Sequence, residues 1–178
     1  MKTTKRSFVY SAAVVLQILV LANAQNSIQY SGRVAQKDQN WVQFDWSAVR
    51  IDYVWQGSSI AAVFQDVGNM YDVFVDGELV LILNTTTTQT NYPIVKIASG
   101  SHNITMIKRT EASIGIATFG GFVVDGTPVP PMSRKPTASS RKIEMIGDSI
   151  TCAFGDMGKV PCNFTPQTEM LSSKIYHN

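Results

Sequence analysis

One serine in this sequence stands where a nucleophile would be placed. Residues 143–146 form a short apolar stretch that runs into Gly147, Asp148 and Ser149. This pattern predicts a buried strand that delivers a serine at its carboxyl end, the edge of an α/β sheet where catalytic groups sit. A serine hydroxyl attacks only when a base takes its proton and N–H donors hold the oxyanion. Because only 29 residues follow Ser149, we expect the chain to lack both.

The two histidines do not supply that base. His102 falls in a predicted strand and is interpreted as a surface or hydrogen-bonded core residue, and His177 lies next to the chain end. Asp148, like Gly147, is interpreted as structural, its carboxylate accepting backbone N–H groups. Two histidines and two cysteines are too few for the four ligands of a structural zinc site, so no metal is expected.

The first 24 residues are predicted to be a secretory signal peptide. Lys2, Lys5 and Arg6 precede an apolar run, and residues 22–24 read Ala-Asn-Ala, a small-x-small cleavage site. The competing interpretation, a membrane anchor, needs about 20 apolar residues, and this run is shorter. Without it, 12 basic residues face 13 acidic ones, a net charge of −1. We therefore expect a secreted protein with neither a nucleic-acid partner nor a membrane association after cleavage.

Cysteines and glycosylation motifs fit that compartment. Cys152 and Cys162 are close in sequence, and an oxidising environment favours a disulfide between them over two free thiols. Asn84, Asn103 and Asn163 each begin an Asn-x-Ser/Thr motif, where a glycan would place the residue on the surface. Chance occurrence in a threonine-rich chain is the alternative for these motifs.

Residues 25–125 are predicted to form an all-β domain. Stretches rich in β-branched and aromatic residues alternate between polar and apolar positions and recur between turn signals. They cover residues 48–55, 60–64, 71–75, 79–83, 93–97, 102–108 and 114–124. Asp76-Gly77 predicts a two-residue hairpin, and Gly120-Gly121 predicts a bulge. Breaks at Gly57-Ser58 and Ser99-Gly100 separate further strands. This spacing favours a β-sandwich or jelly roll.

The rest of the chain divides into a linker and a second unit. Residues 126–141 contain four prolines and are predicted to be a stiff spacer rather than part of the sheet. Residues 142–178 are predicted to contain the first strand, the nucleophile loop and a helix beginning near Thr165. One strand and one helix cannot bury a core, so we expect this unit to be incomplete.

Three tryptophans could offer a flat surface to a sugar. Trp41, Trp46 and Trp55 all fall in the predicted β-domain. Aromatic residues in a β-sandwich more often fill the core or cover its edge, and this is the favoured interpretation.

Residues 141–152, Arg-Lys-Ile-Glu-Met-Ile-Gly-Asp-Ser-Ile-Thr-Cys, resemble the first signature block of the SGNH (GDSL-type) hydrolases. The match is closest to carbohydrate esterase family two, the acetylxylan-esterase-like enzymes. Further segments resemble that family in the same order. They are residues 49–51, 71–77, 108–112, 117–119, 161–165 and 168–169.

The resemblance implies an N-terminal jelly roll followed by a flavodoxin-like α/β/α hydrolase domain. Ser149 would be the nucleophile and its backbone N–H one oxyanion donor, acting without metal or cofactor. The implied partner is an acetylated plant-type polysaccharide or oligosaccharide, from which O-acetyl groups are removed. We expect this chain to be an N-terminal fragment that is inactive alone. The alternatives are a non-catalytic polysaccharide-binding β-sandwich and a non-functional truncated product.

Overall fold

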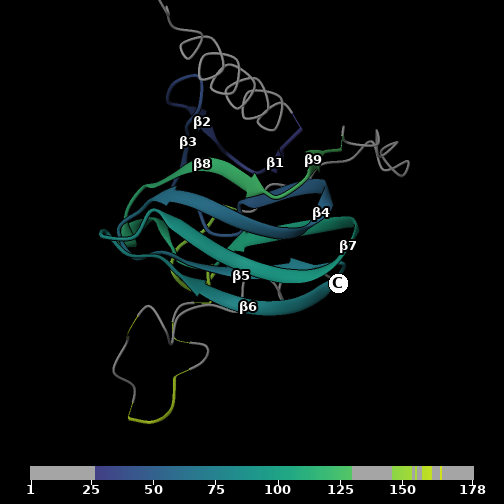
Figure 1. Ribbon diagram of the computed structural model, residues 1–178. Helices are drawn as coiled ribbons and strands as arrows, with labels where there is room; N and C mark the ends of the chain where they lie inside the picture. The colour runs from purple at the N-terminus through teal and green to yellow at the C-terminus, as the bar shows by residue number, and fades with distance from the viewer. Residues whose placement is uncertain (1–26, 130–145, 154, 156–157, 162–164, 166–178) are drawn as a thin grey trace, which may run out of the picture.

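The computed structural model describes residues 27–129, 146–153, 155, 158–161 and 165, and Figure 1 shows that these are almost entirely β-structure. The predicted signal peptide, residues 130–145 and the predicted helix after Thr165 lie outside the described residues. No α-helix occurs in the described part, and none there is long and apolar enough to cross a membrane. The all-β prediction is therefore confirmed, whereas a following hydrolase domain is not shown.

The strands form one antiparallel sheet. They are β1 (Gln29–Ser31), β2 (Ala35–Gln36), β3 (Val42–Phe44), β4 (Arg50–Gln65), β5 (Met70–Val75), β6 (Glu78–Asn84), β7 (Asn91–Lys108), β8 (Ala117–Val124) and β9 (Thr127–Pro128), with a 3-10 turn η1 (Ala112–Ile114). Neighbours follow the order β2-β3-β8-β4-β7-β5-β6, and β1 and β9 also pair with β4. β4 and β7 form the long central ribbon of the sheet (Figure 1).

The predicted breaks at Gly57 and Gly100 are wrong as strand ends. Both glycines lie inside the continuous strands β4 and β7, where they pair with each other directly before a register shift between Gly57 and Ser59. The reason is Asp125, whose carboxylate accepts the Ser58 and Ser59 N–H groups at 2.8 and 3.0 Å. These bonds replace ladder bonds and let β4 continue through the irregularity. A side chain at position 57 would lie 2.5 Å from this carboxylate, so the close approach requires glycine.

Other local signals are confirmed. Asp76 and Gly77 join β5 to β6 with positive φ at both positions, 52° and 88°. Two such residues are what a two-residue hairpin turn with matching twist demands. Gly120 is skipped in the β4–β8 register, as expected of a bulge. The linker prediction is wrong at its first residues, because Thr127 and Pro128 form β9 and pair with β4.

The core is aromatic and packs β4 against β5, which is not its neighbour in the sheet, as well as against β8. The ring of Phe64, late in β4, lies 4.8 Å from that of Tyr71 on β5 and 4.9 Å from that of Phe119 on β8. Such contacts add roughly 0.5–1.5 kcal/mol each beyond the burial of area. Trp55 is fully buried in this core, as predicted. Trp41 is half-buried and covers Gly120, where a Cβ would lie 2.7 Å from its ring.

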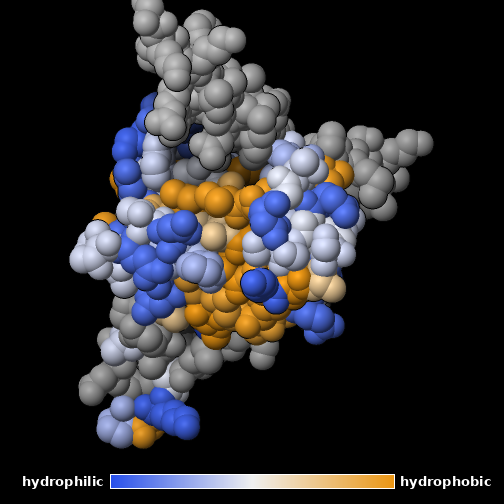
Figure 2. All heavy atoms as spheres, viewed as in Figure 1, coloured by the Kyte–Doolittle hydropathy of each residue, from blue (hydrophilic) through white to orange (hydrophobic). Residues whose placement is uncertain are grey.

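One edge of the sheet is apolar at its surface. β6 pairs with β5 at the end of the strand order, and Leu79, Val80 and Ile82 on it are exposed. Figure 2 shows apolar surface gathered over β5 and β6. An edge strand of this kind leaves backbone groups and apolar side chains open to solvent.

Candidate active site

The turn that carries Ser149 is held by its own backbone and by Asp148. The carboxylate of Asp148 accepts the Ile150 N–H at 3.0 Å, and its carbonyl accepts the Cys152 N–H at 3.3 Å. The Ala153 N–H bonds the Ile150 carbonyl at 2.9 Å, which closes the turn. Ser149 is exposed at the surface of this turn. Exposure of this residue is what a nucleophile requires.

Gly147 is required by the way Thr151 folds back. A Cβ at position 147 would lie 2.0 Å from the Thr151 hydroxyl oxygen, so no larger residue fits without rearrangement. The described end of the predicted buried strand, residues 146 and 147, is a loop without strand pairing, and Ile146 is exposed rather than buried. Residues 142–145 lie outside the described residues, so the strand itself stays a prediction.

The serine turn rests on the loop between β3 and β4. The Ser47 hydroxyl donates to the Cys152 sulfur at 3.4 Å, which joins segments 105 residues apart. Ala48, next in the loop, has a left-handed φ of 61°, a conformation that costs a non-glycine residue about 1 kcal/mol or more. Backbone bonds hold it there, because the Ala48 N–H bonds the Lys108 carbonyl at 2.8 Å.

Lys108 holds this loop in place through hydrogen bonds from its side chain. Its side chain is fully buried at the end of β7, and Nζ donates to three carbonyl oxygens. These belong to Asp45 at 2.8 Å, Thr110 at 2.5 Å and Glu111 at 3.3 Å. Burial lowers the pKa of Lys108 to about 8, while neighbouring acidic groups oppose that shift. At neutral pH the ammonium is charged and clamps two loops together.

A buried polar network supports the segment after Lys108. Asp66 accepts hydrogen bonds from the Asn69 amide and the Tyr71 hydroxyl, both at 2.6 Å. The Thr110 hydroxyl donates to the Asn69 side-chain oxygen at 2.5 Å. Burial, followed by the charge of Asp66, raises the pKa of Tyr71 well above its usual range. Buried polar groups that satisfy one another in this way fix a unique local geometry.

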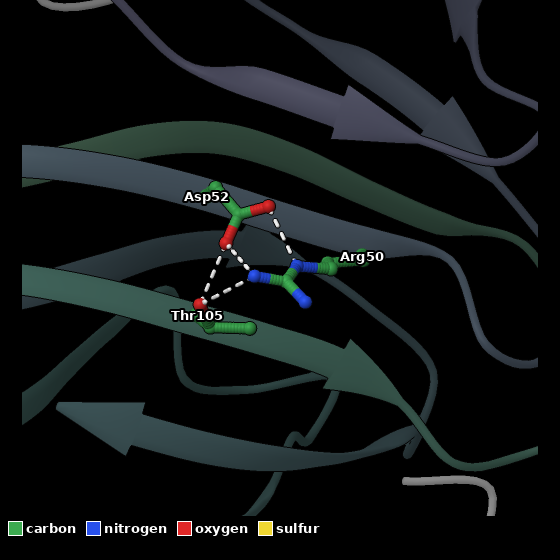
Figure 3. A network of polar contacts seen from close by, with 3 residues as sticks. All are labelled: Arg50, Asp52 and Thr105. Carbon is green, nitrogen blue, oxygen red and sulfur yellow. Dashed lines mark hydrogen bonds and ion pairs between the residues drawn. The ribbon is translucent and has the colours of Figure 1, made fainter. Parts of the chain in front are cut away.

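Two ion pairs differ in their surroundings. Arg109 contacts Asp72 at 3.1 Å with both side chains nearly fully buried, at 2% and 4% exposure. Arg50 and Asp52 lie together at 2.6 Å with a quarter of each side chain exposed, and the Thr105 hydroxyl also donates to Asp52 at 2.6 Å. Figure 3 shows this second, more exposed group across β4 and β7. Neither pair contacts the serine turn through a described interaction, so both are interpreted as structural.

No described residue acts as a base toward Ser149. His102 instead binds the Asp76 carboxylate through Nδ1 at 2.7 Å and the Ala98 carbonyl through Nε2 at 2.9 Å. Since both ring nitrogens face acceptors, the imidazolium is favoured, and the Asp76 bond raises the pKa of His102. This matches the prediction of a hydrogen-bonded histidine. His177 lies outside the described residues.

The remaining predicted sites are placed in part. Cys152 is a free cysteine here, and Cys162 lies outside the described residues, so the disulfide stays a prediction. Asn84 and Asn103 are exposed, as a glycan would need, and Asn163 lies outside the described residues. Within the described part of the chain no three His, Cys, Asp or Glu residues gather to hold a metal ion.

The sequence reasoning missed the loop of residues 45–48 and its fastening by Lys108. A charged residue directly after the apolar end of β7 was the available signal. The sequence also predicted Trp46 to fill the core or cover its edge, but in the structure this residue is 41% exposed. The guanidinium carbon of Arg33 lies 5.8 Å from the centre of its ring.

Comparison with known proteins places this arrangement in context. The family described as Carbohydrate esterase 2 N-terminal matches residues 30–132. The cellulase/esterase CelE of Acetivibrio thermocellus is 33% identical over 145 residues, which are 80% of this chain and 17% of that protein. An acetylxylan esterase / glucomannan deacetylase of Cellvibrio japonicus is 29% identical over 75% of this chain and 34% of that protein.

Solved structures agree with the sequence relatives. A family two carbohydrate esterase from Clostridium thermocellum, in complex with cellohexaose, has a TM-score of 0.73 and 33% identity. The similarity covers 82% of this chain and 45% of that one. A family two esterase from Cellvibrio japonicus, at 24% identity, shares the fold with a TM-score of 0.73. The chain therefore spans less than half the length of these relatives.

Proposed function

Because this chain belongs to the Carbohydrate esterase 2 N-terminal family, we propose that it is the N-terminal part of a secreted carbohydrate O-acetyl esterase of the SGNH type. The similar proteins are carbohydrate esterases by name, and one is an acetylxylan esterase / glucomannan deacetylase. The observation that carries the proposal is the exposed Ser149 in a turn fixed by Asp148 and seated on the β-domain. The proposed substrate is an acetylated plant-type polysaccharide.

In the proposed reaction Ser149 Oγ attacks the acetyl carbonyl carbon. A base removes the hydroxyl proton, a tetrahedral oxyanion forms, and the backbone N–H of Ser149 is one of its donors. Collapse of this intermediate breaks the bond to the sugar oxygen, which leaves with the proton. Water then hydrolyses the acetyl-serine and releases acetate. The described residues include the proposed nucleophile but no side chain placed as its base, so we propose that the 178-residue chain alone is inactive.

Two proteins test this proposal. One is the chain itself, and the other is a chimera in which residues 25–161 are continued by the remainder of the Acetivibrio esterase. Circular dichroism would establish that both are folded. We expect the chimera to release acetate from acetylated xylan and the Ser149→Ala chimera to lose this activity. The chain alone should release no more acetate than the Ser149→Ala chimera. Acetate release by the chimera that survives Ser149→Ala would overturn the serine assignment.

The chain alone gives a second check. Nitrophenol release from p-nitrophenyl acetate that disappears on Ser149→Ala would show that a base is present within these residues. That result would refute the proposed inactivity while supporting the nucleophile.

Secretion is part of the same proposal and rests on residues 1–24. Expression with the native N-terminus in a secreting host should place the protein in the medium. N-terminal sequencing should then read from Gln25. Retention in the cell with Met1 intact would contradict it.

The alternative is a binding module without catalysis. It is favoured by the similar structure solved in complex with cellohexaose and by the aromatic surface that Trp46 leaves open. Affinity electrophoresis in xylan or glucomannan measures this binding, and the chimera separates the two functions, because a binding module would be retarded but would give no serine-dependent acetate release.

A further inference from the structure

Trp46 is the tryptophan that the fold leaves open. Its side chain is 41% exposed, while Trp55 is fully buried and Trp41 covers Gly120 at the sheet. An exposed indole loses the burial that usually stabilises so large an apolar side chain. Exposed aromatic residues on a fixed scaffold are characteristic of binding surfaces.

The loop that presents Trp46 is fixed on both sides of it. The carbonyl of Asp45, one residue before, accepts a hydrogen bond from the buried Lys108 ammonium at 2.8 Å. On the other side, the Ala48 N–H bonds the Lys108 carbonyl and the Ser47 hydroxyl bonds the Cys152 sulfur. The Arg33 guanidinium over the indole restricts the ring itself. Since little ordering remains to be done on binding, such a surface favours affinity.

The same contacts limit how far Trp46 can lie from Ser149. Ser47 touches Cys152, and Cys152 is bonded through its N–H to the carbonyl of Asp148. One peptide step, one side-chain contact and the hydrogen-bonded turn from Ser149 to Cys152 limit the distance between the Cα atoms of Trp46 and Ser149 to at most about 18 Å. An extended oligosaccharide spans that distance, so one ligand can reach both residues.

We propose that Trp46 is a sugar-stacking residue and that, with Arg33 beside it, it forms a polysaccharide subsite next to the serine turn. The C–H face of a pyranose ring packs on the indole, and the chain of sugars runs toward Ser149. The ligand class is a β-1,4-linked plant polysaccharide, which rests on the proposed function. The β-domain would then contribute directly to substrate binding.

Binding of oligosaccharide to the 178-residue chain tests this inference without catalysis. Isothermal titration calorimetry with xylohexaose and mannohexaose gives the dissociation constants, and affinity electrophoresis in glucomannan gives an independent value. We expect Trp46→Ala to weaken binding about twofold to twelvefold, the range that corresponds to loss of one aromatic contact, and Trp46→Phe to keep most of the affinity. Leu79→Ala is the control, because it removes an apolar side chain from β6 whose residue is 52% exposed, somewhat more than Trp46.

The outcomes separate this inference from the function on which it rests. Equal affinities of the original chain and Trp46→Ala, with melting temperatures unchanged, would overturn the subsite, as would absence of binding by the original chain. Serine-dependent acetate release by the chimera would still support the esterase in either case. Conversely, an affinity that depends on Trp46 in a chimera that releases no acetate would keep the subsite and sink the esterase.

Discussion

The burial of Lys108 predicts that the stability of the domain depends on pH, because lysine side chains are rarely buried in the charged form. Its pKa falls from the ordinary 10.5 to about 8 through burial. The folded protein therefore holds this proton less tightly than the unfolded chain does. Between these two values the unfolded chain binds more protons, so the free energy of unfolding should rise with pH in this window. The perturbation that isolates the effect is Lys108→Met.

The size of the effect follows from the two pKa values. Raising the pH from 7 to 9.5 should add about 2 kcal/mol to the free energy of unfolding through Lys108 alone. The variant has no proton to exchange at this position and should lack the rise. Below pH 7 the contribution is constant, because Lys108 is then charged in both states. The difference between the two proteins should change only above about pH 7.5.

Urea unfolding followed by tryptophan fluorescence at several pH values measures both proteins. Other groups that titrate are common to the two, so they cancel in the difference. Lys96→Met, which removes an exposed lysine of the same strand, should give a curve parallel to that of the original protein. A difference between the original protein and Lys108→Met that stays flat from pH 7 to 9.5 would refute the reasoning.

The two ion pairs and His102 give further predictions. Arg109→Met should cost about 3–5 kcal/mol, because it leaves the Asp72 carboxylate buried without its cation, whereas Arg50→Met should cost about 1 kcal/mol or less. Urea titrations measure both, and similar losses would contradict the burial argument. Asp76 raises the pKa of His102, so the stabilisation is complete below pH 6.5 and is lost as pH rises through the folded value. The advantage over His102→Gln in thermal melts should shrink from pH 6 to 8, and a constant gap would argue against the pair.

Local signals in the sequence predicted what local chemistry controls. The hairpin at Asp76-Gly77 follows from the preference of these residues for positive φ, which depends on nothing distant. The bulge was also predicted from its two glycines, of which Gly121 has positive φ, but the Trp41 ring that covers Gly120 comes from a distant segment. By contrast, Gly57 looks like a turn until the carboxylate of Asp125, 67 residues from Ser58, supplies partners for the N–H groups after the glycine.

In the candidate site, too, local contacts were predictable from the sequence and long-range contacts were not. The bond that Asp148 makes within its own turn was predictable because the turn is made by neighbouring residues, whereas the role of Ser149 stays a prediction. The burial of Lys108 and the exposure of Trp46 were not, since each depends on which segments the fold brings together. Ser47 meets Cys152 only because the chain returns to the loop between β3 and β4 after 105 residues.

The continuity of β4 and β7 has a consequence for how the domain comes apart. β4 and β7 pair with each other, β4 also pairs with β8, and β7 also pairs with β5. The two central strands therefore connect the β8 side of the sheet to the β5 side. We expect that neither the β5 side nor the β8 side unfolds while β4 and β7 stay paired. Amide protons on the β5 side and on the β8 side should therefore exchange through one common opening, and the domain behaves as a single cooperative unit.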